Sequence, residues 1–280
     1  MPSPCDGDAI PARDTLPGMD KIAIINAVRE RGDLDALGRE PYEPRGILNS
    51  ELALIVAACR TAKIDVLVES GRARGQSTDV LSRYLAGAGG LELYSLERKR
   101  DADAEYCEKR LAGRKGLHLL YGDANFELPK LVRSLRGKQI AVLIDGPKGR
   151  AAVELMAECV AASNDVVLGF IHDMYRRRYG KPAPGRTACE ALFPSAFYTE
   201  DEDYVALTRG ADDAIWAMPS AGLSEPGKLK GGEIGSYGPT LAAIFVDDAD
   251  RARARKRMRH VPILVRVNWA AARLLPAARA

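Results

Sequence analysis

The chain has 280 residues, long enough for one large α/β domain with additions or for two small domains, each with a substantial core. Its 41 Lys and Arg residues nearly balance its 38 Asp and Glu residues, and the formal net charge of +3 gives no strong signal for nucleic-acid binding. The five cysteines are odd in number and form no Cys-x-x-Cys pair, which favours reduced thiols in a cytoplasmic protein over a disulfide scaffold or a zinc site.

The first part of the chain predicts a lead-in followed by two helices. Residues 1–20 are rich in Pro, Gly and Asp and lack a basic segment followed by an apolar one, so we expect a flexible lead-in without an export signal. Apolar residues within 22–28 indicate a short amphipathic helix. A second helix is expected up to residue 62, with Asn49 or Ser50 as its N-cap. No later apolar run approaches the length that spans a bilayer.

Beyond these helices, short apolar runs rich in branched side chains alternate with helical patterns. The predicted strands are 64–69, 92–96, 117–121, 139–145 and 165–171, and the predicted helices between them are 76–86, 101–112, 126–135 and 150–162. Strands separated by helices indicate an α/β fold with a parallel sheet covered on both faces. Right-handed crossovers then bring the carboxyl ends of the strands, and the ligand crevice, to one edge of the sheet.

The regular alternation ends near residue 174. Residues 175–186 form a basic, proline-containing segment and residues 219–239 are glycine-rich, and connections of this length are uncommon unless they bind something or are disordered. Strand-like runs return at 204–207, 214–218 and 241–246. The predicted organisation is a lead-in (1–20), N-terminal helices (21–62), a central sheet domain (63–247) with substrate loops at 175–186 and 219–239, and a basic C-terminal extension (248–280).

An acidic residue stands at or just after the carboxyl end of each predicted strand. In chain order these residues are Glu69, Glu97, Asp123, Asp145 and Asp173. A glycine-containing turn follows the first strand, and Gly71 and Gly75 allow its backbone to bend sharply and to lie close to a ligand. The amides that begin the next helix, near Gln76, would face that ligand. The sequence therefore predicts a ligand site at this edge.

In the order and spacing of these residues, the chain resembles the class I S-adenosylmethionine (SAM)-dependent methyltransferases, most closely the branch of macrocin-type sugar O-methyltransferases. The resemblance covers roughly residues 50–175. The matching segments are Glu69-Ser70-Gly71-Arg72-Ala73-Arg74-Gly75-Gln76-Ser77-Thr78, Ser95-Leu96-Glu97, Gly122-Asp123-Ala124, Ile144-Asp145-Gly146 and His172-Asp173. The resemblance implies a Rossmann-like, doubly wound, mostly parallel seven-stranded sheet with N-terminal helices and a C-terminal extension, and SAM as the cofactor.

The same resemblance implies roles for individual residues in binding SAM. Glu69 would lie near the cofactor's ammonium group, and Gly71 would let the backbone approach its methionine part. Glu97 would accept hydrogen bonds from the ribose hydroxyls, and Asp123 and the Ala124 amide would meet the adenine. The predicted cofactor residues are Glu69, Gly71, Arg72, Ala73, Gly75, Ser77, Thr78, Glu97, Asp123, Ala124 and Asp145. Taken singly, each carboxylate could instead be solvated or cap a helix.

Resembling sugar methyltransferases bind magnesium through carboxylates at the fourth and fifth strand ends, which implies Asp145 and Asp173 as candidate Mg²⁺ ligands. Two departures weaken this prediction. Met174 stands where many relatives carry a second consecutive Asp, and Pro147-Lys148 replaces the Asp-His that usually follows the Asp-Gly of the family. Water and substrate oxygens could still complete the octahedral shell of the ion.

Methyl transfer to a hydroxyl needs an acceptor held in line, and a base or a metal to strengthen the nucleophile. The candidate bases or substrate-positioning groups are Asp145, Lys148, His172 and Asp173. His172 has the titration range of a base, whereas Lys148 would need burial or a cationic neighbour to lose its proton. The alternatives are a histidine hydrogen-bonded beneath the loop and a lysine that faces solvent.

Two basic segments could bind anions. Arg176, Arg177 and Arg178, with Lys181 and Arg186, are expected where a substrate loop would lie, and guanidinium groups bind phosphate or carboxylate well. Residues 251–259 are also basic and could contact an anionic membrane surface, nucleic acid or an acidic partner. In both cases, a solvated charged surface is the alternative. We further favour a homodimer.

Three functions are compatible with these patterns. The first is an enzyme that methylates an oxygen of a small, sugar-like or anionic acceptor. The second is a nicotinamide-dependent oxidoreductase, although the Gly71-x-x-x-Gly75 spacing lacks the tighter Gly-x-Gly-x-x-Gly pattern. The third is a non-catalytic protein that retains the cofactor pocket or only its scaffold.

Overall fold

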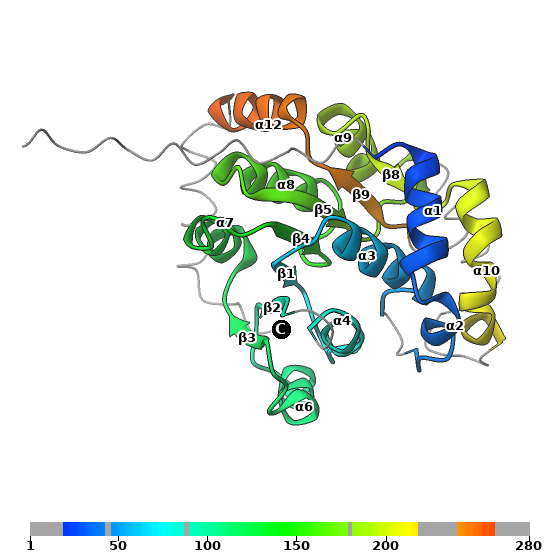
Figure 1. The fold of residues 1–280 in the computed structure, drawn as a ribbon. Helices are drawn as coiled ribbons and strands as arrows, with labels where there is room; N and C mark the ends of the chain where they lie inside the picture. Colours follow the sequence, from blue (N-terminus) through cyan, green and yellow to red (C-terminus); the bar gives the residue numbers. More distant parts are fainter. Residues whose placement is uncertain (1–18, 43–45, 87–89, 179–180, 218–239, 261–280) are drawn as a thin grey trace, which may run out of the picture.

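The computed structural model describes residues 19–42, 46–86, 90–178, 181–217 and 240–260, and its centre is a seven-stranded sheet (Figure 1). The strands follow the order β3-β2-β1-β4-β5-β9-β8. They are β1 (Val66–Ser70), β2 (Glu92–Glu97), β3 (Leu117–Tyr121), β4 (Ile140–Ile144), β5 (Val166–Ile171), β8 (Phe197–Tyr198) and β9 (Ala242–Phe245). The first five run parallel, β9 is antiparallel to β5, and β8 is antiparallel to β9. The predicted α/β fold class, with a mostly parallel seven-stranded sheet, is confirmed.

Helices cover both faces of this sheet. The described helices are α1 (Lys21–Arg31), α2 (Leu34–Leu37), α3 (Asn49–Thr61), α4 (Gln76–Leu81), the π-helical turn η1 (Ser82–Ala86), α6 (Ala102–Leu111), α7 (Ala124–Ser134), α8 (Arg150–Ala162), α9 (Pro184–Leu192), α10 (Glu202–Ala217) and α12 (Asp248–His260). Figure 1 shows α1, α3, α4 and α10 on one side and α7, α8, α9 and α12 on the other. The central strands β1 and β4 are therefore buried along their whole length, as their almost continuous apolar sequences predict.

The order of the strands reverses between β1 and β4, because the chain first moves outward through β2 and β3 and then returns. Ligands of open α/β sheets bind at such a switch point, outside the carboxyl ends of the strands. Here the Ser70 carbonyl accepts hydrogen bonds from the amides of Asp145 (2.9 Å) and Gly146 (3.1 Å). Gly71 follows with φ +85°, and a Cβ atom there would lie 2.7 Å from the Gly146 nitrogen. Glycine is therefore needed to bring the two strand ends this close.

The C-terminal half corrects two predicted strands. The run at 241–246 is confirmed as β9, but the runs at 204–207 and 214–217 belong to α10, and residue 218 lies outside the described residues. In α10 the buried residues Tyr204, Thr208 and Ala211 recur at helical spacing and face the core shared with α3. A window of four or five residues is too short to separate this period from that of a strand.

The predicted basic loop 175–186 is partly wrong, because much of it has regular structure. It contains a small hairpin of β6 (Arg177–Arg178) and β7 (Lys181–Pro182), after which α9 begins at Pro184. Proline suits the first position of a helix because the amide that it lacks would have no helical partner there. The two-residue strand β8 was also missed, as were α2 and α9.

The terminal segments agree in part with the predictions. Both N-terminal helices are confirmed by α1 and α3, and the basic segment after residue 248 forms α12, which packs along α8. The described helices include none with the length and apolar character needed to cross a membrane. The predictions for residues 1–18, 219–239 and 261–280 lie outside the described part of the chain.

Candidate active site

The turn after β1 is held together by a buried carboxylate. Glu69 is fully buried, and its two oxygens accept hydrogen bonds from the hydroxyls of Ser77 (2.5 Å), Thr78 (2.5 Å) and Ser95 (2.6 Å). Burial raises the pKa of Glu69 more than these three hydrogen bonds lower it. The carboxylate thus ties the start of α4 to β1 and β2. The position of Glu69 beside the cofactor's ammonium stays a prediction, and in this structure the hydroxyls of Ser77 and Thr78 face the Glu69 carboxylate.

Two more predicted cofactor residues brace the strand ends. Arg72 donates hydrogen bonds to the carbonyls of Ser95 (2.7 Å) and Leu120 (2.8 Å), and it lies 4.7 Å over the ring of Tyr121. Gly75 has φ +84°, and a Cβ atom there would collide with the sulfur of Cys107 in α6. Arg72 and Gly75 therefore contribute to the packing of β2, β3 and α6, while the buried Nε and Nη2 atoms of Arg72 have no hydrogen-bond partner among the described residues.

Glu97 and Asp123 occupy the ends of the next two strands and are half-buried. The Glu97 carboxylate accepts hydrogen bonds from the amides of Ala73 (2.9 Å) and Arg98 (2.6 Å). Asp123 caps α7, which begins at Ala124, and accepts hydrogen bonds from the backbone (3.0 Å) and side-chain (2.9 Å) amides of Asn125. Both carboxylates are thus fixed at the sheet edge while retaining some exposure. The capping alternative holds for Asp123, and it leaves room for a ligand contact.

A cavity of about 350 Å³ lies between the ends of β2 and β3 and helix α7, within the size range of small-molecule pockets. It is lined by Leu96, Leu120, Tyr121, Glu127, Lys130, Leu131 and Ser134. Leu96 directly precedes Glu97 in β2, and Tyr121 closes β3 shortly before Asp123. Its walls therefore combine apolar side chains of β2, β3 and α7 with polar and charged side chains of α7, close in sequence to the two strand-end carboxylates.

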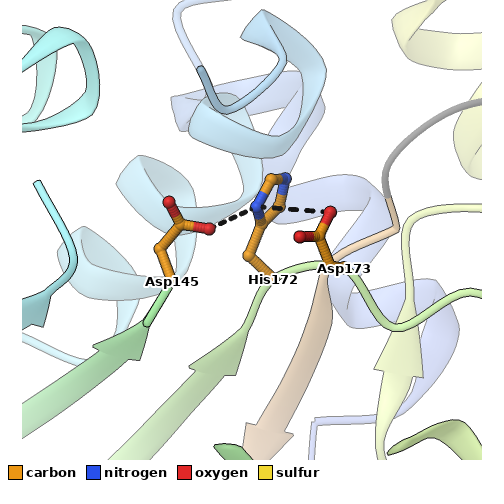
Figure 2. Close-up of side chains that lie close together, drawn as sticks. All are labelled: Asp145, His172 and Asp173. Carbon is orange, nitrogen blue, oxygen red and sulfur yellow. Dashed lines mark hydrogen bonds and ion pairs between the residues drawn. The ribbon is translucent and has the colours of Figure 1, made fainter. Parts of the chain in front are cut away.

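Four predicted catalytic residues come together at the ends of β4 and β5. Figure 2 shows Asp145 after β4 pointing toward His172, and Asp173 on the other side of the imidazole. His172 Nδ1 lies 2.5 Å from Asp145 Oδ1 and 3.8 Å from Asp173 Oδ1. The Lys148 ammonium contacts Asp145 Oδ1 and lies 2.7 Å from Asp173 Oδ2. We call these four residues the strand-end cluster.

A fifth ionisable residue, Glu51 of α3, contacts the cluster through His172. Its Oε2 lies 3.3 Å from His172 Nε2 and accepts a hydrogen bond from the Leu48 amide (3.0 Å), whereas its Oε1 has no hydrogen-bond partner among the described residues. Glu51 was not among the predicted site residues. A Glu at the third position of a helix is the ordinary sign of a capping interaction, which it also makes here, so no local pattern connects it with His172.

The charges in the strand-end cluster shift one another's titration. Burial alone would lower the pKa of His172, but the negative charges of Asp145, Glu51 and Asp173 outweigh it and raise that pKa well above 6.5. Burial would raise the pKa of Asp145 and Asp173, yet His172 and Lys148 lower both, that of Asp173 to about 2. For Lys148, the two aspartates outweigh burial and raise the pKa. At neutral pH the cluster therefore holds ionised aspartates beside a protonated imidazole and an ammonium group.

The backbone around Asp173 is strained, and its neighbour is unsuited to metal binding. Asp173 has φ +61°, an uncommon value for a residue with a side chain, and it is held by a hydrogen bond from the Tyr175 hydroxyl (2.8 Å). Met174, at the position where an acid is expected in many relatives, is fully buried in the core. Its side chain supports the strand end instead of reaching the site.

The predicted anion-binding arginines differ in exposure and in whether a carboxylate already contacts them. Arg176 is exposed, but its Nε lies 3.3 Å from Glu200; Arg177 is exposed in β6, and the side chain of Arg178 lies outside the described part of the chain. Arg186 is buried, pairs with Glu190 (2.6 Å) and Glu200 (2.8 Å), and stacks on Tyr198. The expectation that Arg186 is free to bind an anion is therefore wrong.

Comparisons with known proteins give only distant similarity. No family model matches the sequence, and no curated protein matches it. Among solved structures, the chain is similar to the O-methyltransferase TomG from Streptomyces achromogenes, in complex with SAM (15% identity, covering 79% of this chain and 90% of that one, TM-score 0.43). It is also similar to an O-methyltransferase from Bacillus cereus (14%, 83% and 94%, 0.41) and to the methyltransferase PaMTH1 from Podospora anserina (12%, 79% and 88%, 0.41). These values are too low to bear on the activity of this chain.

Proposed function

We propose that the protein is a SAM-dependent methyltransferase that methylates an oxygen of a small, sugar-like or anionic acceptor. The observation that carries this proposal is the convergence of acidic side chains around the switch point of the sheet. Glu97 and Asp123 lie on the side of β2 and β3, and the strand-end cluster lies on the side of β4 and β5. A cofactor and an acceptor bound over β1 would then meet between the two groups.

The residues on the β2 and β3 side fit an adenosyl group. The Glu97 carboxylate is held by the Ala73 amide, so its orientation is fixed before two neighbouring hydroxyls arrive. Asp123 could accept a hydrogen bond from an amino group, and the nearby cavity offers the apolar side chains of Leu96, Leu120 and Leu131 to a flat ring. When bound, SAM supplies a methyl group on a positively charged sulfur. Other predicted residues of the first turn are buried or packed beneath the proposed cofactor site and support it. They are Glu69, Arg72, Gly75, Ser77 and Thr78.

The strand-end cluster would hold the acceptor. Because His172 is protonated near neutral pH, we assign it to positioning Asp145 rather than to proton removal. Asp145 is ionised and could accept the proton of an acceptor hydroxyl, and Lys148 could stabilise the negative charge that develops on the oxygen. The exposed Arg177 would favour an anionic acceptor.

Titration calorimetry with SAM, S-adenosylhomocysteine and NAD tests the cofactor assignment. We expect the first two to bind and NAD not to bind. Binding of NAD alone would instead support the nicotinamide oxidoreductase, and binding of neither class would reject the cofactor site. Formation of S-adenosylhomocysteine with a panel of hydroxylated acceptors would then separate an enzyme from a non-catalytic SAM-binding protein.

Replacement of Glu97 tests the ribose contact. Glu97→Ala should weaken SAM binding at least about tenfold, because a charge-assisted pair of hydrogen bonds is worth more than about 1.4 kcal/mol. Glu92→Ala is the matched control, since Glu92 is an exposed glutamate at the opposite end of the same strand. Equal effects of the two substitutions in calorimetry would reject the role of Glu97.

Single substitutions in the strand-end cluster test its proposed role in binding and activating the acceptor. Asp145→Ala and His172→Ala should abolish or severely reduce methyl transfer while leaving the affinity for SAM nearly intact, because neither residue lies on the adenosyl side of the switch point. The measurement pairs initial rates with calorimetry on the same samples. Wild-type rates in both variants would remove the cluster from the mechanism.

A further inference from the structure

The strand-end cluster contains a set of atoms that could be mistaken for a divalent-metal site. Asp145, His172 and Asp173 each offer a ligand atom, and these atoms lie within 4.8 Å of one another. Magnesium takes a nearly octahedral shell of oxygen atoms and usually binds one or two carboxylates together with several waters. The set supplies two carboxylates and one imidazole nitrogen, and the neighbouring Met174 is buried and offers no oxygen from its side chain. Whether a divalent ion can bind therefore depends on what already contacts the two carboxylates.

In the observed arrangement, the His172 imidazole does not offer a nitrogen lone pair as a further metal ligand between the aspartates. His172 Nδ1 lies 2.5 Å from a carboxylate oxygen, which can only accept, so Nδ1 carries a hydrogen and has no lone pair for a metal. Its other nitrogen, Nε2, faces away toward Glu51 at 3.3 Å. Nδ1 is thus hydrogen-bonded to a carboxylate, whereas Nε2 is in ion-pair contact with Glu51 and has no hydrogen-bond partner among the described residues.

A cation already stands between the two aspartates. The Lys148 ammonium contacts Asp145 Oδ1 and lies 2.7 Å from Asp173 Oδ2, so it joins the carboxylates that a metal would have to join. Lys148 is only half-exposed, and it comes from the turn directly after β4. With its charge beside the imidazole, the two aspartates have little excess negative charge left to offset the dehydration of a divalent ion.

We propose that the Lys148 ammonium is the resident cation of this site, that it holds Asp145 and Asp173 in place, and that it keeps divalent metal ions out. One part of this inference rests on the proposed methyltransferase function, namely that the acceptor is methylated without the help of a metal ion. Its structural content concerns this chain's own side chains and can be tested without a cofactor or an acceptor.

The test is direct binding of Mn²⁺, a paramagnetic substitute for Mg²⁺, followed by electron paramagnetic resonance. The wild-type protein should show no saturable binding at about 1 mM Mn²⁺, a concentration that fills even weak oxygen-ligand sites. In Lys148→Ala, removal of the ammonium leaves the two carboxylates unpaired, and the affinity for Mn²⁺ should rise at least about tenfold. Lys148→Arg keeps a positive charge at this position and should bind no more Mn²⁺ than the wild type.

The double variant Lys148→Ala/Asp173→Asn is the control for location, because it removes one of the two freed carboxylates and should lose the gained affinity. Saturable binding to the wild type that disappears in Asp173→Asn would overturn the proposal, as would a Lys148→Ala variant that gains no affinity. The wild-type result does not depend on whether a variant folds. Since the measurement contains no SAM, its failure would leave the calorimetric test of the proposed function unaffected.

Discussion

His172 lies between acidic groups from three parts of the chain, so its removal should be costly. In His172→Gln, Glu51 stays fully buried and Asp145 loses one of its two cationic partners, the other being Lys148. Breaking a buried ion pair on one side costs about 3–5 kcal/mol, and we expect about 3 because Lys148 still neutralises Asp145. Urea unfolding measures this loss. The double variant with Glu51→Gln should lose less than the sum of the single variants, and strict additivity would contradict direct coupling.

Gly71 allows a prediction about backbone approach at the switch point. Gly71→Ala would introduce both a strained positive φ and a Cβ atom 2.7 Å from the Gly146 nitrogen. Gly113→Ala is the matched control, because Gly113 has a similar φ of +76° but no atom within 4 Å of the added Cβ. We expect Gly113→Ala to cost about 1 kcal/mol and Gly71→Ala about 1–3 kcal/mol more. Similar free energies of unfolding would show that β1 and β4 do not approach as closely.

Much of the candidate site was predictable at the level of single residues. Asp145, Lys148, His172 and Asp173 follow apolar runs, and parallel strands bring their carboxyl ends to one edge, so their proximity follows from sequence order. Two contacts of the site could not be predicted for the same reason, which is that burial and long-range partners are not encoded locally. Glu69 is turned inward by hydroxyls from α4 and β2, and Glu51 joins the cluster from a helix that precedes the sheet.

At the level of elements, long periodic segments were predicted well and short ones were not. The helices α3 and α8 and the strands β1 to β5 carry apolar patterns that local sequence determines. The error at 204–207 and 214–217 arose because each run is continuously apolar over only four residues, and such a run is as typical of a short buried strand as of a helix. The two-residue strand β8 exists only because β9 is beside it, and no local pattern could reveal it.

Helix α12 offers a test of whether the basic C-terminal segment is docked on the domain. Ala254 is fully buried against the core of α8 and α9, whereas Ala252 on the same helix is exposed. Ala254→Arg should lower the free energy of unfolding by about 2 kcal/mol or more, because a charged side chain must then be accommodated in a packed interface, while Ala252→Arg should change it by about 0.5 or less. Chemical denaturation distinguishes the two. A tolerated Ala254→Arg would mean that α12 does not pack on α8.

The docked arrangement also restricts the predicted contact with an anionic surface. Arg253 and Arg257 are paired with Asp250 and Glu154, each at 2.5 Å, which leaves Arg255, Lys256 and Arg259 as the exposed basic residues of the described helix. Sedimentation with anionic vesicles should therefore be weak and should fall as salt rises, because surface charges are screened within about 10 Å at 0.1 M salt. The absence of sedimentation at low salt would exclude a membrane contact.

At the scale of the whole molecule, the N-terminal helices and the sheet are parts of one folded unit. Side chains of α1, α3 and α10 share a hydrophobic core with β1, β2 and β4, and α3 also supplies Glu51 to the strand-end cluster. A change of charge in the cluster therefore acts on contacts between α3, β4 and β5 together. We expect the pH dependence of global stability to report the state of this cluster.

The direction of that dependence follows from the pKa shifts. Asp145 and Asp173 have lowered pKa values, so their stabilisation is present above the unfolded value of about 3.9 and is lost as pH falls through the folded value, about 2 for Asp173. His172 has a raised pKa, so its stabilisation is complete below about 6.5 and is lost as pH rises through the folded value. All three contributions are therefore complete between about pH 4 and 6.5.

Urea unfolding of the wild type and His172→Gln across this range measures the contribution of the imidazole together with its effect on the titration of Glu51, Asp145 and Asp173, because the titrating groups outside the cluster are common to both proteins. The difference in free energy of unfolding should be constant between about pH 4.5 and 6 and should shrink at higher pH, as the folded wild type begins to lose the His172 proton. It should also shrink toward pH 2, where the aspartates that hold the imidazole become protonated. A difference that grows above pH 7 would mean that His172 is neutral in the folded protein, and Lys148 would then be the charged partner of Asp145.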